Sequence, residues 1–154
     1  MKVYVETSVI SYLTAAPSRD LVVASHQQVT REWWRRRHRF DLFVSEAVLQ
    51  EAAGGDARAA AKRTAALQGM PVLKVDFAAY ALARQLVEAG ALPAKAEIDA
   101  VHVAVAAVNG LDRLLTWNCT HLANPVSRAK IEEVCRRAGC VPPALCTPEE
   151  LGEP

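Results

Sequence analysis

The strongest constraint on the fold of this chain is the repeated alternation of a short apolar run with a longer segment of helical pattern. The apolar runs lie at residues 3–5, 41–44, 71–75 and 113–116, and each is followed by residues that favour a helix. This alternation is typical of α/β domains in which helices flank a parallel β-sheet. We therefore predict a Rossmann-like, three-layer α/β fold, built as a single domain over residues 1–154.

The ends of the predicted helices carry recognisable signals. Thr7 or Ser8 can cap the helix that follows the first strand, and Ser45 can cap a short helix that runs through residue 51. Further helices are predicted at residues 20–38, 57–67, 77–89, 93–109 and 127–138. A short edge strand is predicted at residues 144–146, and a final helical turn is predicted to begin at residue 147.

Composition excludes several classes of protein. The chain is 51% hydrophobic and 23% charged, a balance that argues against disorder. Its formal net charge of +1 does not indicate a nucleic-acid-binding protein, so such binding would need a local patch. The four cysteines lack CxxC and zinc-finger spacing and are expected to be reduced thiols. With no signal-peptide pattern and no apolar stretch that could span a bilayer, we expect a cytoplasmic protein without membrane contact.

Glu6 is the first candidate for chemistry because it directly follows a buried strand. Ligands of open parallel sheets bind beyond the carboxyl ends of the strands. The neighbours of Glu6 are mostly apolar, and a carboxylate buried there requires a cation, a hydrogen-bond network or a helix N-terminus. The backbone amides of the next helix therefore remain an alternative partner for this carboxylate.

Asp99 is the second candidate. From Ile98 onward its helix is apolar almost all round and should be buried, and Asp99 and His102 are the polar exceptions. If Pro93 opens this helix, Asp99 lies beyond the first turn, where the helix dipole is a weak reason for an acid. The i, i+3 spacing also permits an Asp99–His102 pair that holds neighbouring helices. We expect His102 to support a site rather than to be a ligand, and Glu97 to be a surface acid.

Two further polar positions extend the set. Glu51 lies near the end of a predicted helix, where the dipole disfavours an anion, although a solvated surface glutamate would also fit. Asn118 follows the last central strand, as Glu6 follows the first, although asparagine is also a common turn residue. Carboxylates that converge in one cleft repel each other unless a cation neutralises them, and oxygen ligands select Mg²⁺ or Mn²⁺. Such an ion promotes phosphodiester hydrolysis.

Segments over almost the whole chain resemble the motifs of the PIN-domain family, which includes the VapC-type toxins. The most specific is Asp99-Ala-Val-His-Val-Ala, and the others are the strand with Glu6-Thr7-Ser8, residues 45–51 with an acid at Glu51, residues 114–118, and the closing segment 146–151. The resemblance implies a parallel sheet flanked by helices, an Mg²⁺ or Mn²⁺ site and endonucleolytic cleavage of RNA. It also implies frequent homodimers and, in toxin members, a cognate antitoxin that blocks the site.

Carried over to this sequence, the resemblance implies that Glu6, Glu51 and Asp99 bind the metal and form the catalytic centre. The residues expected to support them are Thr7, Ser8, His102, Thr116 and Asn118. Two positions depart from the family pattern, because Glu6 replaces the usual Asp and Asn118 replaces the usual acid. These departures motivate the alternative of a catalytically weakened module that binds RNA or protein. A phosphatase with an aspartyl nucleophile is disfavoured, because it would need a second acid after the first strand and Glu6-Thr7-Ser8 contains only one.

A basic and aromatic cluster lies at residues 31–40, Arg-Glu-Trp-Trp-Arg-Arg-Arg-His-Arg-Phe. Arginine beside tryptophan is a plausible surface for phosphate contact and base stacking, and Arg35, Arg36 and Arg39 are the candidate RNA contacts. The alternative is a helix that buries one tryptophan and leaves its arginines in solvent. The two interpretations are compatible, because different faces of one helix can serve both.

Overall fold

The computed structural model of the protein describes residues 1–152 and contains a five-stranded sheet whose strand pairs are all parallel. Its strands are β1 (Lys2–Val5), β2 (Asp41–Ser45), β3 (Val72–Leu73), β4 (Arg113–Leu115) and β5 (Ala144–Cys146). Their order across the sheet is β3-β2-β1-β4-β5, with Tyr4 of β1 in register with Phe43 and Leu114 on either side. The predicted parallel α/β fold, including the edge strand, is confirmed.

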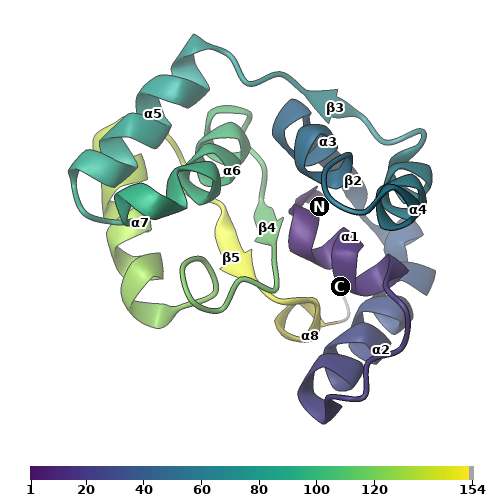
Figure 1. Ribbon diagram of the computed structural model, residues 1–154. Helices are drawn as coiled ribbons and strands as arrows, with labels where there is room; N and C mark the ends of the chain where they lie inside the picture. The colour runs from purple at the N-terminus through teal and green to yellow at the C-terminus, as the bar shows by residue number, and fades with distance from the viewer. Residues whose placement is uncertain (153–154) are drawn as a thin grey trace.

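Helices cover both faces of this sheet (Figure 1). Because crossovers between parallel strands are right-handed, the connections on the β2 side and on the β4 side cover opposite faces. Accordingly, α1, α2 and α4 lie on one side and α5, α6 and α7 on the other. The helices are α1 (Thr7–Thr14), α2 (Leu21–Arg35), α3 (Glu46–Ala52), α4 (Ala57–Leu67), α5 (Phe77–Glu88), α6 (Glu97–Val108), α7 (Pro125–Arg137) and α8 (Pro148–Leu151), with 3-10 turns η1 (Arg37–Arg39) and η2 (Ala94–Ala96).

The strand order changes direction at β1. From β1 the chain steps outward through β2 to β3, and then returns to place β4 on the other side of β1. The loops that leave β1 and β4 therefore diverge, and this switch point is the usual place for a ligand in an open α/β sheet. Glu6 and Thr116 are the first residues after these two strands.

The core explains why the elements form where they do. The side chains of Val3, Tyr4 and Val5 are fully buried because both faces of β1 are covered by helices. Residues 99–107 of α6 are all buried, as its apolar pattern predicted, and Glu97 is exposed as expected. Ile98, which was expected to be buried as well, is 41% exposed. The four cysteines are free thiols, as their spacing predicted. Within residues 1–152 no helix is long and apolar enough to cross a membrane.

Several predicted boundaries were wrong. The helix expected to begin at Pro93 starts at Glu97, because Pro93 has an extended backbone and only a 3-10 turn follows it. Asp99 therefore lies in the first turn of α6 and not beyond it. Neither Thr7 nor Ser8 caps α1, since the N-cap residue is Glu6 itself.

Two other elements are shorter than predicted. The strand expected at 71–75 is reduced to Val72–Leu73, since it is an edge strand that pairs with β2 alone. The helix expected at 20–38 ends at Arg35, and the 3-10 turn η1 follows it. Ser45 caps α3 as predicted, and Thr147 begins the final helical turn.

Candidate metal centre

Glu6 lies at the junction of β1 and α1, with 5% of its surface exposed. Its Oε1 accepts a hydrogen bond of 3.1 Å from the backbone N–H of Ser8, so helix amides satisfy one oxygen, as the sequence-based alternative proposed. Its Oε2 accepts hydrogen bonds from the hydroxyl of Ser8 and, at 2.8 Å, from the hydroxyl of Thr116. The carboxylate is thus held by neutral donors.

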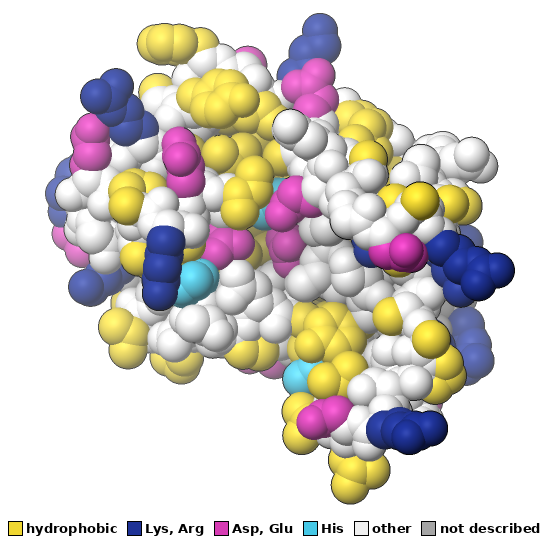
Figure 2. Space-filling model, viewed as in Figure 1, with side chains coloured by type: hydrophobic (Ala, Val, Ile, Leu, Met, Phe, Trp, Pro, Cys, Tyr) yellow, Lys and Arg dark blue, Asp and Glu magenta, His cyan; other side chains and the backbone are white. Residues whose placement is uncertain are grey.

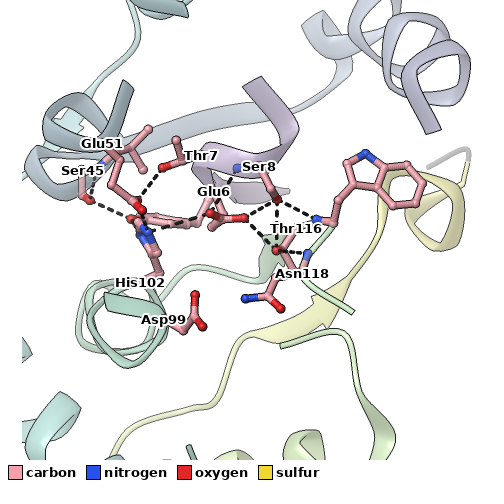
Figure 3. Close-up of polar contacts among 12 residues, drawn as sticks. Glu6, Thr7, Ser8, Ser45, Glu51, Asp99, His102, Thr116 and Asn118 are labelled. Carbon is pink, nitrogen blue, oxygen red and sulfur yellow. Dashed lines mark hydrogen bonds and ion pairs between the residues drawn. The ribbon is translucent and has the colours of Figure 1, made fainter. Parts of the chain in front are cut away.

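Ser8 and Thr116 join the loops that leave the two central strands. The Ser8 hydroxyl accepts a 2.9 Å hydrogen bond from the backbone N–H of Trp117, and the Thr116 hydroxyl accepts one of 2.9 Å from the backbone N–H of Asn118. Each hydroxyl therefore accepts from the loop after β4 and donates to Glu6 (Figure 3). These hydrogen bonds hold the Glu6 carboxylate at the switch point.

Glu51 reaches the same place from the last turn of α3. Its Oε1 accepts a 2.7 Å hydrogen bond from the hydroxyl of Thr7 and lies 2.6 Å from Nε2 of His102. Burial raises the pKa of Glu51, but the hydrogen bond and charge of His102 and the Thr7 hydroxyl outweigh it and hold that pKa below its usual value. Thr7 therefore contacts Glu51, whereas Ser8 contacts Glu6.

His102 is fully buried in α6 at the centre of a hydrogen-bonded chain. Its Nδ1 lies 2.7 Å from the hydroxyl of Tyr4, which lies 2.7 Å from the hydroxyl of Ser45. An ionised Glu51 carboxylate can only accept, so Nε2 of His102 carries the proton of their hydrogen bond. While that bond exists, His102 cannot offer Nε2 to a metal, and its supporting role stays a prediction.

The surrounding carboxylates control the charge of His102. Burial lowers the pKa of this imidazole, but the hydrogen bond to Glu51 and the negative charges of Glu6, Glu51 and Asp99 outweigh burial and raise the pKa above its usual value. Burial also raises the pKa of Tyr4 far above its usual value, so its hydroxyl keeps its proton. The buried chain is therefore built from one cationic or neutral imidazole and neutral hydroxyls.

Asp99 has a partner that the sequence did not suggest. Its Oδ2 lies 2.9 Å from Nδ1 of His121, so the alternative of an Asp99–His102 pair was wrong. The backbone N–H of His121 donates a 3.0 Å hydrogen bond to Oδ1 of Asn118. The side-chain oxygen of Asn118 therefore accepts a hydrogen bond within its own turn.

Of the three carboxylates, Glu6 and Glu51 form a close group with His102, and Asp99 lies outside that group. Ligand atoms of Glu6, Glu51 and His102 lie within 4.8 Å of one another. Figure 3 shows the Asp99 carboxylate directed toward Glu6 from the side of Asn118. Figure 2 shows acidic side chains gathered in a hollow at the centre of this face, between the two groups of helices.

The chemistry of this donor set fits a hard divalent cation. Within residues 1–152, no lysine or arginine forms an ion pair with Glu6, Glu51 or Asp99, whose cationic partners are histidines alone. Carboxylates this close repel each other unless positive charge lies between them. Oxygen ligands on three separate elements are suited to Mg²⁺ or Mn²⁺.

Sequence reasoning missed three residues of the site. Tyr4 and Ser45 resemble an ordinary strand residue and an ordinary helix cap, and only the folded chain brings Tyr4 to His102 and Ser45 to Tyr4. His121 lies in a loop, and its one signal was the spacing of three residues from Asn118, which is typical of a turn closed by an asparagine side chain.

The arginine-rich segment lies at the amino ends of the strands, opposite to the acidic cluster. Residues 35–39 lead into the start of β2, where the backbone N–H of Asp41 donates to the carbonyl of Met1. Arg35, Arg36 and Arg39 are exposed there, whereas the acidic cluster lies beyond the carboxyl ends of the strands. One tryptophan of the segment, Trp33, is buried, as the structural alternative predicted.

The fold and the acidic cluster define a class of protein, namely a parallel α/β domain with carboxylates gathered at the switch point of its sheet. Comparison with known protein families matches residues 3–118 to the PIN domain, and the chain belongs to this family. The resemblance stated from the sequence motifs is confirmed.

A solved structure gives the same picture of the fold. The chain is similar to a chain in the crystal structure of VapBC2 from Rickettsia felis bound to a DNA fragment from their promoter, with a TM-score of 0.61. The similarity covers 96% of this chain and 98% of that chain at 13% sequence identity, so it shows the fold alone. No match was found among curated proteins.

Proposed function

We propose that the protein is a metal-dependent endoribonuclease. The observation that carries this proposal is the convergence of Glu6, Glu51 and Asp99 at the switch point with no lysine or arginine partner among residues 1–152. Membership of the PIN family supports the same conclusion. The ion, Mg²⁺ or Mn²⁺, would supply Lewis-acid activation of the scissile phosphate and of water.

The chain's own residues have distinct roles in this proposal. Glu6 and Asp99 would hold the ion, and Glu51 would complete the cluster or orient the attacking water. His102 would position Glu51, because His102 is buried and its Nε2 lies 2.6 Å from Oε1 of Glu51. Thr116 positions Glu6 through its 2.8 Å hydrogen bond.

The partners proposed for the chain extend beyond RNA. The likeness to VapBC2 supports the proposal that the protein is the toxin of a toxin–antitoxin pair and binds a cognate antitoxin. By the same resemblance we propose a homodimer that acts in the cytoplasm. Arg35, Arg36 and Arg39 are proposed contacts for RNA beyond the acidic cluster.

A nuclease assay on defined single-stranded RNAs, with Mn²⁺ and with EDTA, tests the proposed activity. We expect cleavage that requires the metal and that falls at least about 100-fold in Asp99→Asn, because loss of metal-assisted catalysis costs several kcal/mol. Glu97→Gln is the matched control, since Glu97 lies on the same helix but is exposed, and its activity should equal that of the wild type.

The same assay distinguishes the second candidate function, a binding module without activity. The engagement of Asn118 within its own turn favours this candidate, because the usual fourth acid is absent and its substitute is occupied. RNA binding without Mn²⁺ uptake or cleavage would decide for the binding module.

A further inference from the structure

Three aromatic rings adjoin the acidic cluster on the side of α1 and α2. Trp117 directly follows Thr116, Tyr12 lies on α1 and His26 lies on α2. The rings of His26 and Trp117 are stacked, with 4.0 Å between their centroids and 13° between their planes. Tyr12 lies 5.7 Å from His26 and 5.9 Å from Trp117. We call these three residues the aromatic platform.

Trp117 forms the fixed base of the platform. Its indole Nε1 donates a 2.7 Å hydrogen bond to the hydroxyl of Thr30, which is fully buried on α2. Its backbone N–H is bound to Ser8, so both ends of the residue are held. Only 7% of Trp117 is exposed, whereas Tyr12 and His26 are partly exposed and are the rings that solvent can reach.

The outer face of His26, which points away from Trp117, is covered by neither of the other two rings. Tyr12 is almost equally far from the other two rings, so it flanks the stack and does not cover the face of His26 that points away from Trp117. Within residues 1–152, no group forms a hydrogen bond with the ring nitrogens of His26. A planar ligand could therefore continue the stack and use these nitrogens.

The platform is continuous with the acidic cluster. Tyr12 follows Ser8 by four residues on α1, so the two side chains share one face of the helix, about 6 Å apart along its axis. Ser8 is bonded to Glu6. The space-filling view shows hydrophobic side chains and a histidine just below the central acidic side chains (Figure 2).

We propose that the aromatic platform binds an unpaired nucleobase of single-stranded RNA, next to the phosphate that the acidic cluster addresses. The inference rests on the proposed function, because it presumes an RNA substrate. Stacking on aromatic rings is the general way in which proteins bind unpaired bases, and it is closed to bases inside a duplex.

Other aromatic rings of the chain are less suited to this task. Trp33 is 5% exposed, and the guanidinium of Arg37 lies 4.6 Å from the ring centroid of Trp34 and covers it. The base stacking suggested by the basic and aromatic segment is therefore better served at the acidic edge of the sheet.

The test is the affinity for a fluorescently labelled single-stranded oligoribonucleotide, measured by anisotropy in EDTA so that cleavage plays no part. We expect His26→Ala to weaken binding by about 5-fold to about 100-fold, the range that corresponds to one stacked base. His26→Phe keeps a stacking ring and should bind within about two-fold of the wild type. Phe77→Ala removes an aromatic ring that is 87% exposed on α5, far from the platform, and should have no effect.

A base scan separates stacking from a structural effect of the substitution. We test a series of oligonucleotides, each lacking one base. At one position, removal of the base should weaken binding by the wild type but should not weaken binding by His26→Ala any further. Equal binding by His26→Ala and the wild type would overturn the proposal. So would equal weakening by His26→Ala and His26→Phe, or a loss in His26→Ala that does not depend on which base is missing.

The outcomes also separate this proposal from the nuclease proposal. If the wild type cleaves RNA with Mn²⁺ but His26→Ala binds RNA normally, the platform is refuted and the nuclease stands. If RNA is bound with the predicted loss in His26→Ala but is never cleaved, the nuclease is refuted and the platform stands.

Discussion

Asn118 shows how a single residue can depart from a family pattern and still serve the site. Its side-chain oxygen accepts the backbone N–H of His121, and the imidazole of His121 is thereby placed 2.9 Å from Asp99. In the proposed metal site, the position that usually carries an acid would thus act through another residue. Partners that orient a metal ligand typically affect metal affinity by 10-fold to 100-fold.

We therefore predict that His121→Ala weakens Mn²⁺ binding by about 10-fold to 100-fold, because Asp99 loses the donor that orients it. Calorimetric titration of the metal-free protein with Mn²⁺ measures the change. His38→Ala is the control, since His38 is exposed on η1 at the other edge of the sheet. Unchanged affinity in His121→Ala would show that Asp99 needs no such support.

Tyr4 is a second residue whose role depends on its partners. Replacing it by Phe removes the hydroxyl that lies between His102 and Ser45 and leaves Nδ1 of the buried His102 without a partner, whereas the Ser45 hydroxyl still accepts from the backbone N–H of Val48. We predict that Tyr4→Phe lowers the free energy of unfolding by about 1–3 kcal/mol. Urea denaturation measures the change, and Tyr80→Phe, at a residue that is 59% exposed, should leave stability unaltered. A neutral Tyr4→Phe would mean that water replaces the hydroxyl.

At the scale of elements, the ends of helices position most of the polar groups at the carboxyl edge of the sheet. The last of them, α8, begins with a capping box in which Thr147 and Glu150 bind each other's backbone N–H. Glu150 also forms an ion pair with Arg128 of α7 at 2.8 Å, which ties the two helices together. The hydrogen bond from Arg128 holds the pKa of Glu150 below its usual value, with burial as a smaller opposing effect.

This pair makes stability depend on pH. Because the pKa of Glu150 is lower in the folded chain, its contribution is fully present above the usual glutamate value of 4.5 and is lost as the pH falls through the folded value. We predict that Glu150→Gln, which keeps the capping box, costs at most about 1 kcal/mol at pH 7, since the pair is partly exposed. Thermal unfolding of both proteins should show the difference shrinking below pH 4.5, and a difference that persists there would exclude a charge effect.

At the scale of the whole molecule, the acidic cluster and the arginine-rich segment lie at opposite ends of the strands of one sheet. The four residues of β1 span roughly 13 Å between these two ends. An RNA that contacts both must therefore run along the outside of the domain, whereas a short oligonucleotide would occupy the cluster alone.

We predict that Arg35→Ala combined with Arg39→Ala reduces the salt dependence of binding to a long single-stranded RNA. The slope of log affinity against log salt should fall by about 1.4, about 0.7 for each lost contact with a single-strand phosphate. Binding of a short oligonucleotide and the cleavage of that oligonucleotide should not change. An unaltered slope on long RNA would remove these arginines from the RNA-binding surface.

The sequence by itself determined the α/β class, the burial of α6 and most element positions, because these follow from periodicities and caps that act over a few residues. It also pointed to Glu6, Glu51 and Asp99, although the unfavourable position expected for Asp99 was wrong, because Asp99 lies in the first turn of α6. Local rules failed where a distant part of the chain or a backbone geometry intervened, as at the start of α6 and at the two-residue strand β3.

Only the tertiary structure decided which side chains meet. The hydrogen bonds of His102 to Tyr4 and Glu51 span 98 and 51 residues of sequence, and that between Asp99 and His121 spans 22. No periodicity encodes such pairs, because they arise when strand order brings separate loops to one edge of the sheet. For the same reason, the aromatic platform and its place beside the acidic cluster could not be read from the sequence.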